Sequence, residues 1–378
     1  MKRRTGGTRL LATLGRQAAR SARRLQRTVA LTVTNPVLRA ATQQGQAVGK
    51  AVGKAMGRAV GKAARQAFTG VVTPAPTPVS KGGGIWEEGV WGFSLGIGSM
   101  AQRRYRVFVP PGLSAARPAP LLVLLHGCGQ DAASFAACAR VATVARDARW
   151  VVLMPEQSVQ GNAQRCWNWF RPDARGASEA ALLMSMVDHV CRRYAIVADR
   201  VCAFGLSAGG AMAMMLGLRY PDRFAAVGSH SGAAPYSASN ASQAPRAMRG
   251  ERAPDAGAAR LLLAGRRPPP LLLMHGDEDT VVAYDNATAA AALWLDLVPA
   301  AMPAPAALPP KRVRRGTRRA VDVFDWQSGM RPFLRLVKVE GLRHAWSGGA
   351  PGQAFADPAG PDALKIALRF FSVNGRHD

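Results

Sequence analysis

Residues 200–212 read Arg-Val-Cys-Ala-Phe-Gly-Leu-Ser-Ala-Gly-Gly-Ala-Met, and this stretch decides the fold. Its first part is an apolar run that predicts a buried strand, and the part from Gly209 onward predicts a helix. Between them, Gly205-Leu206-Ser207-Ala208-Gly209 matches the G-x-S-x-G pattern of a sharp strand-to-helix turn. Such a turn raises the serine hydroxyl above the end of a sheet, so Ser207 is the predicted nucleophile.

The segments around this turn alternate between strand and helix patterns. Predicted strands cover residues 102–109, 120–125, 150–155, 200–205, 224–228, 271–275 and 333–339, and predicted helices cover residues 132–146, 180–194 and 209–220. This alternation predicts an α/β fold with a mainly parallel sheet and helices on both faces. Residues 237–270 and 297–320, rich in Ala, Pro and Arg, interrupt the alternation and are interpreted as insertions.

Charge divides the chain into an arm and a folded domain. Lys and Arg total 50 against 23 Asp and Glu, a formal net charge of +27, and residues 1–81 hold 16 of these cations and no acid. We predict a basic, Ala- and Gly-rich arm over residues 1–72, disordered or partly helical, and a Pro- and Gly-rich linker over 73–84. The folded domain is then expected over residues 85–375.

A serine hydroxyl becomes a nucleophile only when a base takes its proton. For this kind of turn the chain order is Ser, acid, His, so the base is sought downstream of Ser207. His344 lies just beyond the last predicted strand, where loops gather at the catalytic edge of a parallel sheet. It is the favoured base, and His230 is the weaker alternative.

The acid is expected in the turn that follows the predicted strand 271–275. Asp277, Glu278 and Asp279 crowd into this turn. Asp279 is favoured because the residues before it are needed to redirect the chain, and Asp277 is the alternative. In this scheme the carboxylate fixes the tautomer of the histidine and stabilises its positive charge.

Backbone N–H groups for a developing oxyanion are expected at two loops. The stretch His126-Gly127-Cys128-Gly129-Gln130 directly follows a predicted strand. We predict that the N–H of Cys128 acts together with that of Ala208, at the start of the helix. His126 and His275 each end a strand before a glycine, and both are predicted to have structural roles.

Together these segments resemble the polyhydroxybutyrate (PHB) depolymerase family of esterases, which is close to feruloyl and acetylxylan esterases. The matching segments lie within about residues 90–372. They are Leu125-His126-Gly127-Cys128-Gly129-Gln130, Cys166-Trp167-Asn168-Trp169-Phe170, Arg200 through Met212, Tyr220-Pro221-Asp222-Arg223-Phe224-Ala225-Ala226 and His344-Ala345-Trp346-Ser347-Gly348-Gly349.

The resemblance implies an α/β-hydrolase fold and ester hydrolysis without a metal or organic cofactor. It implies a triad of Ser207, Asp279 and His344, because the family acid is the Asp of a His-Gly-x-x-Asp-x-x-Val pattern, which falls on Asp279. The implied substrate is a carboxylic ester, either a polyhydroxyalkanoate chain or its oligomers. Feruloyl or acetyl esters are the alternative within the same chemistry.

The resemblance also brings Cys128 and Cys166 near the active site, which implies a disulfide between them; two buried thiols are the alternative. Trp167 and Trp346 are expected to line an acyl- or polymer-binding groove, with packing in the core as the other interpretation. Arg343 stands where the family usually has glycine, and we expect it to narrow the cleft or to bind a carboxylate.

No apolar run in the sequence is long enough for a secretory signal core or a membrane span. We therefore expect a cytoplasmic protein, associated with polymer granules, and export, as in many relatives, is the alternative. The basic arm is a candidate for contact with a polymer granule, an anionic membrane or nucleic acid. A hypothesis of a different class is therefore a polyanion- or granule-binding protein that acts through this arm.

Overall fold

The computed structural model describes residues 83–94, 100–171 and 174–375. The predicted arm (1–72) and most of the predicted linker (73–84) lie outside these residues. The first strand of the described part begins at Ile85. None of the described helices combines the length and the apolar character that a bilayer crossing requires.

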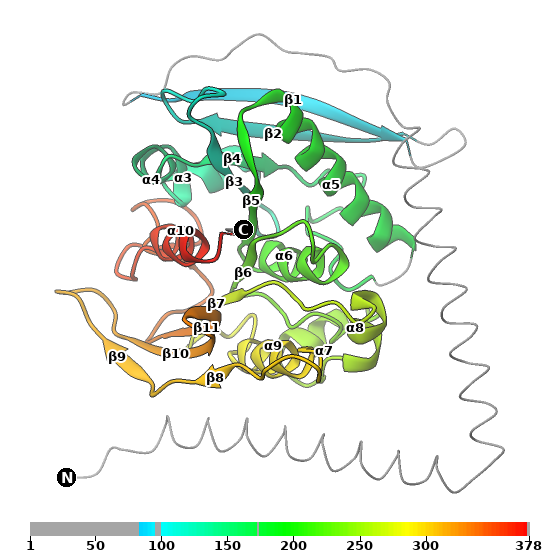
Figure 1. Ribbon diagram of the computed structural model, residues 1–378, viewed down its shortest axis with the longest axis vertical. Coiled ribbons are helices and arrows are strands. Elements are labelled where there is room, and N and C mark those ends of the chain that lie inside the picture. Colours follow the sequence, from blue (N-terminus) through cyan, green and yellow to red (C-terminus); the bar gives the residue numbers. More distant parts are fainter. Residues whose placement is uncertain (1–82, 95–99, 172–173, 376–378) are drawn as a thin grey trace, which may run out of the picture. The chain divides into compact units, whose positions relative to one another are not determined.

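A single large sheet of eleven strands runs through the described residues in the order β1-β2-β4-β3-β5-β6-β7-β11-β10-β8, with β9 paired to β10 (Figure 1). The strands are β1 (Ile85–Ser94), β2 (Met100–Val109), β3 (Ala119–Leu125), β4 (Val151–Pro155), β5 (Ile196–Gly205), β6 (Ala226–His230), β7 (Leu271–Gly276), β8 (Ala306–Ala307), β9 (Lys311–Val313), β10 (Val321–Ser328) and β11 (Arg331–Val339). The run from β4 to β11 is parallel throughout, and the outer strands are antiparallel. The sheet is therefore mainly parallel, as predicted.

Helices cover both faces of this sheet, which confirms the predicted layering (Figure 1). One face carries α3 (Ala132–Cys138), α4 (Val141–Ala148) and α10 (Ala363–Val373). The other face carries α5 (Ala174–Arg193), α6 (Ala208–Arg219), α7 (Ala244–Met248), α8 (Ala256–Leu263) and α9 (Asp285–Asp296). Crossover connections through helices bring the carboxyl ends of all the parallel strands to one edge, where the loops meet.

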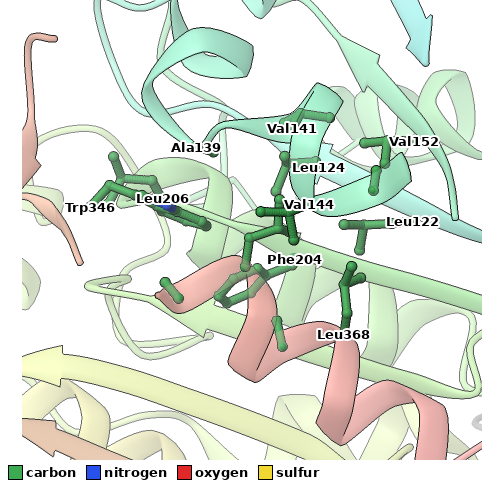
Figure 2. Close-up of a cluster of buried hydrophobic side chains, with 14 of the residues drawn as sticks. Leu122, Leu124, Ala139, Val141, Val144, Val152, Phe204, Leu206, Trp346 and Leu368 are labelled. Atoms are coloured by element: carbon green, nitrogen blue, oxygen red, sulfur yellow. The ribbon is translucent and has the colours of Figure 1, made fainter. Parts of the chain in front are cut away.

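Alternate side chains of the buried strands fill the core beneath that edge. Leu122 and Leu124 of β3 and Phe204 of β5 belong to the cluster that α4 and α10 cover (Figure 2). Trp346 belongs to the same cluster, with its ring 5.2 Å from that of Phe204. Because such interiors are close-packed, the ends of β3 and β5 form a rigid base for the turns that follow them.

The sequence prediction was wrong about one helix. Residues 132–146 form two helices, because Arg140 takes a left-handed conformation (φ 54°) between α3 and α4. No glycine or proline marks this break, so composition alone gave no signal for it. Of the two segments interpreted as insertions, 237–270 contains α7 and α8, and 297–320 contains β8 and β9, which extend the sheet edge.

Candidate active site

The turn between β5 and α6 exists because two of its residues lack a side chain. A Cβ added to Gly205 would lie 2.4 Å from the backbone carbon of Gly209, and one added to Gly209 would lie 2.2 Å from the carbonyl oxygen of Leu125. Ser207 itself has φ 57° and ψ −120°, a strained conformation for a residue with a side chain. The turn therefore holds Ser207 at the carboxyl end of the sheet. The residue is 9% exposed.

His344 hydrogen-bonds to this hydroxyl, and Asp279 hydrogen-bonds to His344. The Nδ1–H of His344 donates to Oδ2 of Asp279 at 2.7 Å. Its Nε2 lies 3.0 Å from the Oγ of Ser207. With the proton held on Nδ1, the lone pair on Nε2 is free to accept the hydroxyl proton of Ser207.

The environment of Asp279 keeps its carboxylate ionised. Burial by itself would raise the pKa of Asp279, but hydrogen bonds from His275 and His344, together with their charges, lower it well below its ordinary value. Its Oδ1 accepts the backbone N–H groups of Val281 (3.0 Å) and Val282 (2.8 Å). A carboxylate held in this way is oriented for one imidazole and remains a hydrogen-bond acceptor.

Asp277 and His230, the alternative acid and base left open by the sequence, do not lie in hydrogen-bonding contact with the pair of Ser207 and His344 side chains. Asp277 accepts the N–H of Gly341 at 2.7 Å and lies 3.3 Å from Nζ of Lys338, so its carboxylate faces away from His344. His230 is fully buried, with its ring stacked against Trp346 at 5.1 Å. His344 and Asp279 are therefore the pair that the structure brings to Ser207.

The loop after β3 lies beside the serine. A Cβ added to Gly127 would lie 3.6 Å from the Cβ of Ser207, which places this loop against the nucleophile turn. Gly127 and Gln130 close the loop through two mutual hydrogen bonds. Among the described residues, neither Cys128 nor Ala208 has an acceptor for its backbone N–H, which leaves both free for an oxyanion.

His126 has the structural role that its place in the sequence predicted. Its Nδ1–H donates to the carbonyl of Gly127 at 2.7 Å, and its Nε2 accepts the N–H of Gln157 at 3.1 Å. Burial lowers the pKa of His126 to about 4, so the ring is neutral at ordinary pH. It thereby ties the loop after β3 to the segment that follows β4.

A disulfide joins Cys128 to Cys166. The segment that carries Cys166 is held by the buried carboxylate of Glu179. This carboxylate accepts hydrogen bonds from the backbone N–H of Asn168 (2.7 Å) and the side chain of Gln157 (2.5 Å). The Cys128 backbone is thus linked covalently to a segment with its own buried polar anchor. This network around Glu179 had no signal in the sequence, because it joins residues from separate elements.

Two expected substrate contacts are corrected by the structure. Trp167 and Trp346 are both 0% exposed. The Nε1–H of Trp167 donates to the carbonyl of His126 at 3.0 Å, and Trp346 packs in the core against His230. Both indoles support the active-site loops from inside instead of lining a groove, because their large rings fill the space beneath the loops.

Arg343 remains on the surface, unlike the tryptophans. It lines a cavity of about 510 Å³ beside the His344 loop, together with Glu278, Arg319 and Asp357. Arg319 is paired with Asp357 at 2.5 Å, and Arg343 and Glu278 are the other charged residues that line this space. The described residues contain no cluster of three His, Cys, Asp or Glu side chains arranged to hold a metal.

Comparison with known proteins gives a family match over the part of the chain that holds the nucleophile. The family model described as Esterase PHB depolymerase matches residues 103–306. The chain is 40% identical over 119 residues to poly(3-hydroxyalkanoate) depolymerase C of Paucimonas lemoignei, covering 31% of this chain and 28% of that protein. It is 32% identical over 134 residues to feruloyl esterase B of Neurospora crassa, covering 35% of this chain and 44% of that protein. The chain therefore spans less than half the length of these curated relatives.

Solved structures show the fold. Acetyl xylan esterase from Aspergillus awamori superposes with a TM-score of 0.58 and 16% sequence identity, over 75% of this chain and 99% of that one. An S-formylglutathione hydrolase from Agrobacterium tumefaciens gives a TM-score of 0.52 and 17% identity, over 82% and 100%. These likenesses confirm the α/β-hydrolase fold that the sequence led us to expect.

Proposed function

The chain belongs to the Esterase PHB depolymerase family, and from this premise we propose that it is a serine esterase with Ser207 as nucleophile, His344 as base and Asp279 as the orienting acid. The observation that carries the proposal is the continuous hydrogen-bonded series from Asp279 through His344 to Ser207, at 2.7 and 3.0 Å. Three side chains from three separate loops meet in the order that acyl transfer requires.

The first half of the reaction makes an acyl-enzyme. The Oγ of Ser207 attacks the ester carbonyl while Nε2 of His344 takes the hydroxyl proton. The carbonyl oxygen gains negative charge, which the N–H groups of Cys128 and Ala208 bind. The tetrahedral intermediate then collapses, His344 gives its proton to the leaving alkoxide, and the alcohol departs.

The second half repeats these steps with water. His344 deprotonates a water molecule, which attacks the acyl carbon and forms a second tetrahedral intermediate. Its collapse releases the carboxylic acid and returns the proton from His344 to Ser207. In both halves the ionised carboxylate of Asp279 stabilises the imidazolium, consistent with the lowered pKa of this group.

Polyhydroxyalkanoate chains or their oligomers are the proposed natural esters. The 40% identity with the Paucimonas lemoignei depolymerase supports this substrate class. Feruloyl or acetyl esters are the second candidate, supported by the 32% identity with the Neurospora crassa feruloyl esterase. Both candidates use the same triad and differ only in what the cleft accepts.

The Cys128–Cys166 disulfide supports a location in an oxidising compartment instead of the cytoplasm favoured by the sequence. Disulfides persist in secreted and periplasmic proteins, whereas cytosolic thiols are kept reduced. Labelling of free thiols in protein purified from its native source tests this location. Three reactive thiols after denaturation indicate an intact disulfide, and five would contradict the proposed compartment.

A hydrolysis panel tests the activity and the substrate class. Turnover of p-nitrophenyl esters is expected for the wild type and should be lost in Ser207→Ala, whereas Ser239→Ala, on the surface, serves as a matched control. Amorphous PHB, its dimer, and feruloyl and acetyl esters then rank the substrate classes. Equal turnover by Ser207→Ala and the wild type would refute the esterase proposal.

A further inference from the structure

His230 is a fully buried histidine that hydrogen-bonds both to Ser207 and to the loop that carries His344. It ends β6, one strand away from the nucleophile strand β5. Its carbonyl oxygen accepts the backbone N–H of Ser207 at 2.8 Å. Its ring Nε2 accepts the backbone N–H of Ser347, three residues after His344, at 3.1 Å.

The hydrogen bonds of the two ring nitrogens determine the tautomer. Because Nε2 accepts a hydrogen bond from a backbone N–H, the ring proton must be on Nδ1. Nδ1 lies 3.1 Å from the Oγ of Ser231, which accepts that proton. The opposite tautomer would place two N–H donors against each other inside the core.

The surroundings also keep this ring uncharged. Burial lowers the pKa of His230 to about 3, and the nearby charges of His275 and His344 act in the same direction. The ring lies flat against Trp346, at 5.1 Å with an interplanar angle of 24°. A neutral ring is required here because a protonated one would lose its acceptor and would repel the His344 imidazolium formed during acylation.

We propose that His230 is a positioning residue of the active site, which sets the separation between the Oγ of Ser207 and Nε2 of His344. It does so by holding the main chain of the serine turn with its carbonyl and the main chain of the histidine loop with its ring. Its ring is fully buried and therefore out of reach of a substrate. The inference rests on the proposed esterase function, because the separation that it sets matters only for transfer of the serine proton.

Loss of the ring acceptor has a defined consequence. The N–H of Ser347 would be left buried without a partner, and the loop would shift to satisfy it. A displacement of about 1 Å between reacting groups lowers turnover by about 100-fold. Substrate binding does not depend on this distance, so KM should change little.

Two substitutions of His230 by amide side chains of different length provide the test. In His230→Gln the side-chain oxygen reaches the position of Nε2 and can accept the Ser347 N–H, whereas in His230→Asn it reaches only the position of Nδ1. We expect His230→Asn to lower kcat by about 10- to 100-fold with KM within about twofold, and His230→Gln to restore kcat to within about threefold of the wild type. His189→Asn is the control, since His189 is another ring stacked on a tryptophan (Trp91, 4.4 Å), but in α5.

A measurement on the wild type keeps the inference falsifiable even if the variants do not fold. Spectra of protein with ¹⁵N-labelled histidine, with the ring signals assigned to individual residues, should show the His230 ring neutral and protonated on Nδ1. A kcat unchanged in His230→Asn, or an Nε2-protonated His230, would overturn the positioning role while leaving the esterase proposal intact. Absence of turnover in the wild type would instead overturn the esterase proposal, and the ring tautomer would still be measurable.

Discussion

The Nε2 atom of His344 lies 3.0 Å from the Oγ of Ser207, although the two residues are 137 positions apart in the chain. A different structural feature holds each residue in place. A strained turn between two glycines holds the serine, and a loop fixed at its far side by His230 holds the histidine. The short distance is therefore a product of the whole sheet edge and not of either segment alone.

The two neighbouring aspartates after β7 should behave differently. Asp279→Asn would present an amide to Nδ1 of His344 and favour the wrong tautomer, so we expect kcat to fall by on the order of 10⁴. Asp277→Asn keeps an oxygen for the Gly341 N–H and loses only the exposed pairing with Lys338. Its kcat should stay within about twofold of the wild type. Steady-state kinetics on a soluble ester decide between them, and equal losses in both variants would contradict the assignment.

Alanine at Gly209 should prevent the nucleophile turn from forming. The added Cβ would lie 2.2 Å from the carbonyl oxygen of Leu125, so the variant is expected to lose several kcal/mol of stability or to fail to fold. Gly265→Ala is the matched control. Gly265 has a left-handed backbone (φ 81°), unlike Gly209, but nothing lies within 4 Å of its added Cβ, so only about 1 kcal/mol of backbone strain is expected. Urea unfolding compares the two, and similar losses would argue against a steric requirement at Gly209.

Removal of the disulfide should lower both stability and turnover. The bond closes a loop between residues 38 positions apart, so Cys166→Ser is expected to cost about 3–4 kcal/mol of unfolding free energy. Turnover should fall as well, because the N–H of Cys128 is a proposed oxyanion donor. Cys191→Ser, which removes a free thiol, should change neither quantity. An unaltered kcat in Cys166→Ser would show that the oxyanion loop holds its shape without the bond.

Buried histidines should make the fold sensitive to acid. The folded-state pKa of His126 is about 4, below its ordinary value of 6.5, because burial disfavours the charged ring. In the unfolded chain this histidine takes up a proton as the pH falls below about 6.5, and in the folded protein it does not. Its stabilising contribution is therefore complete above pH 6.5 and declines by about 1.4 kcal/mol per pH unit down to pH 4.

The variant His126→Gln isolates this contribution. It should be less stable than the wild type at pH 7.5, because hydrogen bonds to Gly127 and Gln157 are altered. Between pH 6.5 and 4 its unfolding free energy should fall less steeply than that of the wild type. Urea titrations at a series of pH values measure both slopes, and identical slopes would mean that His126 takes up its proton in the folded state as well.

Arg343 should influence which esters the cleft accepts. It is exposed and lines the cavity beside the His344 loop, so Arg343→Gly is expected to raise KM for esters that carry a free carboxylate, such as hydroxybutyrate dimers. The effect should be about two- to fivefold, the size of an exposed ionic contact. Neutral p-nitrophenyl esters should be unaffected, and Arg314→Ala, in the exposed segment after β9, is the control. An equal rise in KM for neutral esters would indicate a steric effect instead of a charge effect.

Local sequence was sufficient wherever local sterics decide the conformation. The apolar runs of β3, β5 and β7 could be predicted because strands buried on both faces need continuous apolar side chains. The nucleophile turn could be predicted because backbone crowding at Gly205 and Gly209 excludes other residues. The break at Arg140 escaped prediction because no glycine, proline or other turn residue marks its left-handed conformation.

The sequence by itself thus determined the alternation of strands and helices around the nucleophile, the serine turn, and a short set of candidate acids and bases, whereas β1, β10, α9 and α10 were not predicted. Only the tertiary structure decided that Asp279 and not Asp277 faces His344, that Trp167 and Trp346 lie in the core, and that His230 contacts both catalytic loops. The physical reason is that side-chain direction and burial depend on contacts between segments far apart in the chain. Those contacts form only when the parallel strands bring their carboxyl ends to a common edge.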